Sequence, residues 1–229
     1  MTKLLVAVKS CLRDAKEGYN QAIRDTWGKH FGDVPVRFFI GNSWLAECDE
    51  PVYLKDDEIS LNCLDDYDSL PYKTKAICKY VFPFYDHIFL CDTDTFVIPD
   101  KLLTCGFEKY DYAGRFGHMP ALGTTFTYQN DGRNNRVEDC HPWASGGVGY
   151  SLSSRAAKLV SQTEPMSWAE DLFVGQCIGP KIQSGEMIGW DIPEFECQTA
   201  WHFPRRMHGN KVYHPSFKWL EKMYQEHIK

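Results

Sequence analysis

Residues 86–98 read DHIFLCDTDTFVI, an apolar run with two aspartates separated by one residue. The run is typical of a buried strand, and Asp92 and Asp94 fall near its carboxyl end. A D-x-D pattern at a strand end favours a bound divalent cation, with a solvated turn as the plain alternative. Which chemistry a cation would serve has to come from the rest of the chain.

Strands and helices alternate along the residues that precede this run. We expect a buried opening strand in 3–10 (KLLVAVKS), a helix in 18–31 that stops near Gly28, a second strand in 34–41 (VPVRFFIG) and a helix in 65–85 with Pro71 at an early position. With 86–98 as the third strand, this alternation predicts an α/β fold with a parallel sheet flanked by helices.

In such a sheet, ligands bind beyond the carboxyl ends of the strands. The residues that fall at these ends are Lys9, Ser10, Gly41, Asp92 and Asp94. The second half is less regular. We expect a polar loop in 128–139, a turn into a strand in 143–153, a short capped helix in 153–160 and a helix from 168 onward with acids in its first turn.

Composition limits the classes of protein that the chain can represent. Its 229 residues are 43% hydrophobic and suit one domain over 1–229. The net charge of −6 argues against nucleic acid as a partner. No apolar segment approaches the roughly 20 residues needed to cross a bilayer, and no signal peptide precedes the first strand, so we expect a soluble, cytoplasmic protein.

The nine cysteines form no C-x-x-C pair, which disfavours a structural zinc site. Cys78, Cys91 and Cys177 lie in apolar runs and are typical of buried cysteines in a reducing compartment. A partial disulfide framework in a secretory lumen is the alternative.

The D-x-D-x-T stretch also fits a phosphatase of the haloacid dehalogenase type, in which Asp92 would be the nucleophile. That motif normally follows the first strand and needs a later acidic pair for magnesium. Here it follows the third expected strand, and the downstream stretch EDLFVG has no second acid at the required spacing. The other interpretation is a glycosyltransferase, whose carboxylates hold Mn²⁺ or Mg²⁺ at the diphosphate of a nucleotide sugar.

Six collinear stretches over roughly residues 3 to 180 resemble the β1,3-glycosyltransferases, the family of β3-galactosyl and β3-N-acetylglucosaminyl transferases, core 1 synthase and Fringe. They are KLLVAVKS with QAIRDTWG, VRFFIG, DDYDSLPYKTKAICKYV, FLCDTDTFVIPDKL, HPWASGGVGYSLSSRAAKLV and AEDLFVGQCIG. Six motifs in order are far more specific than any one of them. Thr93 stands where the family has the middle acid of D-D-D.

The resemblance implies a GT-A (Rossmann-like) fold, an inverting mechanism, a UDP-sugar donor and a glycan or glycoprotein acceptor. Residues 1–100 would form the nucleotide-binding half, and 101–229 the acceptor half with a tail that closes the metal site. Asp94 would be the main metal ligand with Asp92 as its partner. The donor would be bound by Ser10, Arg24, Lys73, Asp92 and, through its phosphates, Lys218.

Asp171 of EDLFVG would be the catalytic base. Inverting transfer is a single in-line displacement, so it needs one base for the acceptor hydroxyl and one cationic site for the leaving diphosphate. A carboxylate in the first turn of a helix can be oriented rigidly towards a cleft. The alternative is that Glu170 and Asp171 only complement the helix dipole.

Other candidates have plain alternatives. Gly146 and Gly147 would let the backbone pass close to a sugar, or serve only a tight turn. Trp143 and Trp168 would stack on a sugar face, or only pack.

For the third metal ligand, the family pattern favours His214, followed by His208, with His202 also competing. Relatives in animals and plants are generally anchored in the Golgi, whereas this chain starts at the first strand. We therefore expect a free cytosolic enzyme, a viral or microbial one, or the first domain of a longer polypeptide; a truncated catalytic domain would have its place in the Golgi lumen. A non-catalytic carbohydrate-binding module is a further alternative, and the presence of Asp94 and Asp171 speaks against it.

Overall fold

The computed structural model describes residues 2–42, 52–116, 126–130, 133–137, 141–192, 199–202, 206–208, 211–213 and 218–228. Its centre is a sheet of eight described strands in the order β11-β7-β10-β5-β1-β2-β4-β3. These strands are β1 (Leu4–Lys9), β2 (Val36–Gly41), β3 (Val52–Tyr53), β4 (Glu58–Leu61), β5 (His87–Asp92), β7 (Tyr112–Gly114), β10 (Tyr150–Ser153) and β11 (Gly189–Asp191).

The pairing of these strands is mostly parallel. β1 is parallel to both β2 and β5, β2 to β4, and β7 to β11, whereas β10 and β3 run against their neighbours. The expected α/β class, with a mostly parallel central sheet flanked by helices, is confirmed. Because the sheet takes strands from both 1–100 and 101–229, the two expected halves share one sheet; their separate tasks stay a prediction.

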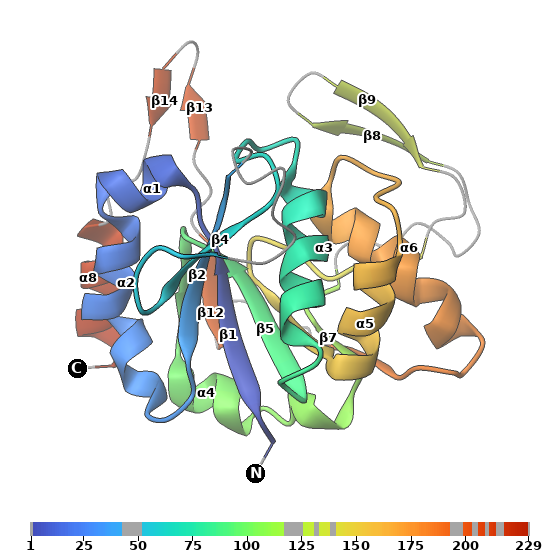
Figure 1. The fold of residues 1–229 in the computed structure, drawn as a ribbon, viewed down its shortest axis with the longest axis horizontal. Helices are drawn as coiled ribbons and strands as arrows, with labels where there is room; N and C mark the ends of the chain where they lie inside the picture. Colours follow the sequence, from blue (N-terminus) through green and yellow to red (C-terminus); the bar gives the residue numbers. More distant parts are fainter. Residues whose placement is uncertain are drawn as a thin grey trace.

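Helices cover both faces of the sheet (Figure 1). They are α1 (Leu12–Glu17), α2 (Tyr19–Asp25), α3 (Leu70–Val81), α4 (Pro99–Thr104), α5 (Ser154–Gln162), α6 (Glu170–Gln183) and α8 (Lys218–His227), with 3-10 helices η1 (Trp27–Phe31) and η3 (Phe107–Lys109). One buried cluster lies between the sheet and α3, α5 and α6, and a second between the sheet and α2, η1, α4 and α8.

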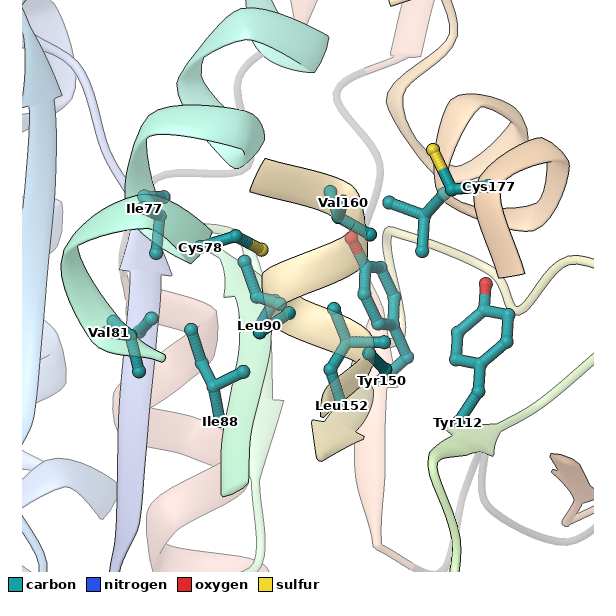
Figure 2. Packing of buried hydrophobic residues seen from close by; sticks show 14 of the residues in the cluster. Ile77, Cys78, Val81, Ile88, Leu90, Tyr112, Tyr150, Leu152, Val160 and Cys177 are labelled. Atoms are coloured by element: carbon teal, nitrogen blue, oxygen red, sulfur yellow. The ribbon is translucent and has the colours of Figure 1, made fainter. Parts of the chain in front are cut away.

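Figure 2 shows the first cluster, in which Leu90 lies between Ile77 and Ile88 on one side and the rings of Tyr150 and Tyr112 on the other. The two rings meet edge to face with centroids 5.6 Å apart. Apolar burial on both faces explains why β1, LLVAVK, is buried at every position, as is typical of a central parallel strand.

Local sequence signals set the helix boundaries near the site. Pro71 stands in the first turn of α3, where its missing N–H costs no helical hydrogen bond. The Ser153 side chain caps α5 by accepting from the Ala156 N–H at 3.2 Å. α6 begins at Glu170, with Glu170 and Asp171 in its first turn. All three helices are where the sequence predicts them.

Three elements differ from the sequence prediction. The strand expected over 86–98 ends at Asp92 and is followed by a turn and the short strand β6 (Thr95–Val97), which pairs with β12 (Ala200–His202). The helix expected over 18–31 consists of α2 and then η1. Strand β4 was not predicted, because its sequence EISL carries a buried glutamate at an inward position.

The polar loop expected over 128–139 lies partly in an antiparallel hairpin of β8 (Phe126–Asn130) and β9 (Arg133–Val137). A second hairpin joins β13 (Arg206–His208) and β14 (Lys211–Tyr213). Both hairpins lie at the end of the molecule where β1 and β5 end (Figure 1).

The expected burial of Cys78, Cys91 and Cys177 is confirmed. These three and the other described cysteines, Cys11, Cys63 and Cys105, are free thiols. Within the described part of the chain, each helix is too short or too polar to cross a bilayer.

Candidate functional site

A cavity of about 690 Å³ opens beyond the carboxyl ends of β1 and β5. It brings together residues from the ends of these strands, the turn before α3, the loop before β10 and the first turn of α6. Its lining consists of Lys9, Ser10, Cys11, Arg13, Asp14, Asp65, Asp66, Tyr67, Leu70, Lys73, Asp92, Thr93, Asp94, Ser145, Gly146, Gly147, Trp168, Ala169, Glu170 and Asp171.

The D-x-D residues lie on the turn between β5 and β6. The Asp92 N–H donates to Thr95 Oγ1 at 3.2 Å, and Thr95 Oγ1 donates to the Gly147 carbonyl at 2.7 Å. The Thr93 hydroxyl is buried and donates to Asp14 Oδ2 at 2.6 Å. The sequence predicts a strand through 86–98, whereas these hydrogen bonds accompany a turn after Asp92; both aspartates line the cavity.

A buried ammonium group lies below this turn. Lys9 Nζ is 3.2 Å from Asp92 Oδ1 and 2.9 Å from Glu170 Oε2. Burial by itself lowers the pKa of Lys9, but the facing carboxylates of Asp92 and Glu170 more than offset this and hold that pKa above its ordinary value. Lys9 therefore stays charged and ties the end of β5 to the start of α6.

The neighbouring acids Glu170 and Asp171 have different surroundings. Besides Lys9, Glu170 accepts from the hydroxyl of Thr74 at 2.9 Å and from that of Tyr150. Its side chain is buried and its oxygens are occupied by partners within the protein, so Glu170 is a structural anchor. Asp171 is only half-buried and faces the cavity.

Two backbone amides orient the carboxylate of Asp171. Its Oδ2 accepts from the Gly146 N–H at 3.2 Å and its Oδ1 from the Leu172 N–H at 2.8 Å. A Cβ on Gly146 would lie 2.9 Å from Glu170 Oε2 and 3.3 Å from Asp171 Cβ, so glycine permits this close approach. Burial and the neighbouring charge of Glu170 raise the pKa of Asp171, against the lowering influence of the Gly146 N–H and of Lys9.

Ser10 and Lys73 lie side by side in the cavity lining. The ammonium of Lys73 is buried and donates to the Ser10 carbonyl at 2.6 Å and to Asp65 Oδ1 at 2.8 Å. Asp65 also accepts from the Gly41 N–H at 2.8 Å and the Leu12 N–H at 2.7 Å. Lys73 therefore anchors the end of β1 to α3, and it also lines the cavity.

Arg24, expected to contact the nucleotide, lies outside this cavity. Its guanidinium donates to both oxygens of Asp57, at 2.7 and 2.8 Å, and to Glu58 Oε1 at 2.7 Å. These acids flank and begin β4, so Arg24 fastens α2 to the edge of the sheet. A chain of contacts through Glu58 and Asn20 connects it to Ser10.

Of the remaining candidates from the second half of the chain, some line the cavity and others do not. Trp168 lines the cavity, whereas Trp143 packs against Gly175 of α6 and is not among the lining residues. Lys218 is exposed at the start of α8 and is also outside the described lining. His214 lies outside the described residues, and His202 and His208 are described only as strand positions in β12 and β13.

The lining fits a divalent cation. Acidic side chains outnumber basic ones among the described lining residues, so an anionic diphosphate would be repelled without a cation to neutralise it. Asp92 and Asp94 offer the hard oxygen ligands that Mg²⁺ and Mn²⁺ prefer. The described residues hold no group of three or more histidine, cysteine or acidic side chains arranged to bind a metal, so these two carboxylates would need further ligands.

Sequence reasoning missed several lining residues. The sequence indicates only that Lys9 falls at a strand end, and it gives no role to Asp14, Asp65 or Tyr67. Asp65 belongs to the family-like stretch DDYDSLPYKT, but its contacts with Gly41 and Leu12 join segments far apart in the chain. No local pattern could have indicated them.

Comparison with known proteins gives a family match and a curated relative. The sequence model of the galactosyltransferase family matches residues 20–183. A probable beta-1,3-galactosyltransferase 13 of Arabidopsis thaliana is 30% identical over 113 residues, which cover 42% of this chain and 32% of the relative. The match thus spans about a third of that relative's length.

Solved structures match at lower identity. HddC from Yersinia pseudotuberculosis is 13% identical, covering 84% of this chain and 90% of that chain with a TM-score of 0.43. The inositol-1-phosphate CTP transferase from T. maritima is 12% identical, covering 97% and 96% with a TM-score of 0.48. A putative nucleotide-diphospho-sugar transferase from Desulfovibrio desulfuricans G20 is 12% identical, covering 84% and 80% with a TM-score of 0.41.

Proposed function

The chain belongs to the galactosyltransferase family, and from this membership and the geometry of the cavity we propose that it is a metal-dependent, inverting glycosyltransferase. The donor is a UDP-sugar, and the acceptor is a hydroxyl group of a glycan or glycoconjugate. The observation that carries the proposal is that Asp171 lines the same cavity as Asp92 and Asp94, while the buried Lys9 ammonium contacts both Asp92 and Glu170, the neighbour of Asp171.

Asp171 is the general base of the proposed reaction. The Gly146 and Leu172 amides fix its carboxylate, which leaves lone pairs to take the proton of the acceptor hydroxyl. Its raised pKa brings it nearer to neutral pH, where a general base is most effective. Glu170, occupied by Lys9, Thr74 and Tyr150, does not compete for this task.

Asp92 and Asp94 would hold Mn²⁺ or Mg²⁺, which when bound neutralises the negative charge on the diphosphate leaving group. Lys9 keeps the Asp92 carboxylate in place through its 3.2 Å contact. Ser10, with Lys73 behind it, would border the nucleotide, and the Gly146–Gly147 backbone would border the transferred sugar. Arg24 supports this wall indirectly, through Glu58 and Asn20.

Calorimetric titration of UDP, with and without Mn²⁺, tests the donor assignment. We expect binding that requires the cation and is lost in Asp94→Ala, and unchanged binding in the control Asp100→Ala, which removes an exposed carboxylate from the first turn of α4. Binding of UDP that ignores both the cation and Asp94 would refute the metal assignment.

The phosphatase alternative predicts a different product. With Asp92 as nucleophile, a phosphate ester would release inorganic phosphate through an aspartyl-phosphate, and no sugar would be transferred. The family match over 20–183 favours transfer. A release of inorganic phosphate that depends on Asp92, with no release of UDP from UDP-sugars, would reverse this choice.

A further inference from the structure

Two aromatic rings from distant parts of the chain meet at the cavity. The ring centroids of Tyr67 and Trp168 are 6.1 Å apart, with 48° between the ring planes. Both residues line the cavity that contains Asp171, and Tyr67 is 57% exposed. A large aromatic side chain left open to solvent inside a concave site is the kind of surface that a ligand covers.

The backbone beneath both rings is held in place. The turn that carries Tyr67 is closed by a 2.8 Å hydrogen bond from the Ser69 N–H to Asp66 Oδ1. The segment that carries Trp168 contains a 3.2 Å hydrogen bond from the Ala169 N–H to Ser167 Oγ and leads directly into α6. The two rings are therefore presented by anchored segments, which lowers the entropic cost of ligand binding.

The chemistry of this surface suits a sugar ring. A pyranose has one face of C–H groups and an edge of hydroxyls, so it can stack on aromatic rings while its hydroxyls reach polar neighbours. Trp168 and Asp171 line the same cavity, so a sugar stacked on Trp168 would share that cavity with the base. The acceptor, and not the transferred sugar, is the substrate that needs this position.

We propose that Tyr67 and Trp168 form the acceptor subsite, which binds a pyranose through its C–H face and directs a hydroxyl group towards Asp171. This inference rests on the proposed glycosyltransferase function and adds the class of acceptor to it. The competing occupant of the same rings is the uracil base of the donor, which also has a flat face suited to stacking.

Saturation-transfer NMR tests the subsite without requiring turnover. Methyl β-D-galactopyranoside and methyl N-acetyl-β-D-glucosaminide serve as probes, in the presence of UDP and Mn²⁺. We expect saturation on the C–H protons of one face of the ring of at least one probe. It should be lost in Tyr67→Ala and retained in Tyr67→Phe, which keeps the ring.

The matched control is Tyr72→Ala, because Tyr72 is also an exposed tyrosine, 52% open to solvent, but lies on α3 outside the lining. Saturation should persist in this variant. The subsite is refuted if neither glycoside receives saturation from the wild-type protein, or if Tyr67→Ala leaves the saturation intact.

Calorimetry with UDP distinguishes a failure of the acceptor subsite from a failure of the proposed glycosyltransferase function. Tyr67→Ala should bind UDP as the wild type does; a weaker affinity for UDP in this variant would assign the rings to uracil and overturn the acceptor subsite. Failure of the wild-type protein to bind UDP would remove the donor assignment, whereas the glycoside experiment would still decide whether the rings bind a pyranose.

Discussion

The ammonium group of Lys9 donates a 2.9 Å hydrogen bond to a carboxylate oxygen of Glu170, although 161 positions separate the two residues. The same ammonium lies 3.2 Å from Asp92. One buried cation thus joins the turn that carries the expected metal ligands to the helix turn that carries the expected base. The spacing between these two parts of the site depends on this contact.

Replacing Lys9 with methionine should strongly destabilise the fold. It would leave Glu170 buried without its counter-ion, and breaking a buried ion pair from one side costs about 3–5 kcal/mol. Urea denaturation measures the change in the free energy of unfolding. The double variant Lys9→Met/Glu170→Gln should recover part of the loss, because no unpaired charge remains; purely additive losses would show that the pair is not coupled.

Asp171→Asn should nearly abolish sugar transfer while UDP and Mn²⁺ still bind. Loss of a general base lowers the rate by about 10²–10⁴-fold. The measurements are kcat for transfer and the Kd for UDP by calorimetry. An equal loss of binding and transfer would contradict the assignment of Asp171 as the base, since a carboxylate that only complements the helix dipole has no specific task in the chemical step.

As the pH is lowered, the rate of transfer should begin to fall at a higher pH than it would if the base were an aspartate with an ordinary pKa. Burial and the Glu170 charge raise the pKa of Asp171, and the base must be deprotonated to act, so the acid limb of kcat/KM should have its midpoint above about 4. Because the charge of Lys9 lowers the pKa of Asp171, Lys9→Met should move this midpoint further up. A midpoint at or below the ordinary value would contradict this arrangement.

The same raised pKa links Asp171 to stability. When a carboxyl group has a higher pKa in the folded state than in the unfolded state, it contributes to the free energy of unfolding at low pH, and this contribution is lost as pH rises through the folded-state pKa. Asparagine does not ionise, so the Asp171→Asn variant escapes this loss. Its free energy of unfolding relative to that of the wild type should therefore increase between acid and neutral pH. Thermal unfolding at several pH values measures the trend; a flat difference would indicate that ionisation of Asp171 carries no cost.

The parts that the sequence predicts well are those with a local signal. The apolar run of KLLVAVKS, the helix that starts around Pro71 and the acids that open α6 are signals contained within a few residues, and the structure contains all three elements. The aspartates of the D-x-D motif, Asp171 and Gly146 were expected at one site, and they line one cavity.

The parts that the sequence does not predict depend on long-range pairing. The sequence of strand β4 looks too polar for a buried strand. Glu58 can be buried there because Arg24, 34 positions away, balances its charge, and no local pattern indicates that contact. The sequence predicts strand at the turn that carries the D-x-D motif, because the hydrogen bonds of Thr93 to Asp14 and of Thr95 to Gly147 have no local signature. Arg24 was assigned to the nucleotide from its motif, whereas its partners lie at β4.

Gly146→Ala should reduce transfer with little effect on binding of the donor nucleotide. The new Cβ would lie 2.9 Å from Glu170 Oε2 and 3.3 Å from Asp171 Cβ, so one or both acids must move. Displacement of the base from the acceptor lowers kcat, because the geometry of the reacting groups is lost. The kcat and the UDP affinity should be measured together; an unchanged kcat would show that the close packing of Gly146 against Asp171 does not position the base.

The variant Arg24→Met distinguishes between two roles of Arg24, binding of the nucleotide and support of the fold through Asp57 and Glu58. Because its guanidinium is hydrogen-bonded to Asp57 and Glu58, we expect a loss of about 1–3 kcal/mol in the free energy of unfolding. UDP affinity should change little. A large loss of UDP affinity in a fully folded variant would instead return Arg24 to the nucleotide.

The pH dependence of the Arg24→Met effect gives a second test. Burial raises the pKa of Glu58, but hydrogen bonds from Arg24, Asn20 and Lys55 outweigh it and hold that pKa below its ordinary value. A lowered folded-state pKa stabilises the protein above the unfolded value, about 4.3, and the contribution is lost as pH falls through the folded pKa. The destabilisation caused by Arg24→Met should therefore be largest near neutral pH and shrink in acid. An effect of equal size at all pH values would mean that Arg24 acts through packing, for example over the Phe38 ring 4.7 Å away, and not through the charge of Glu58.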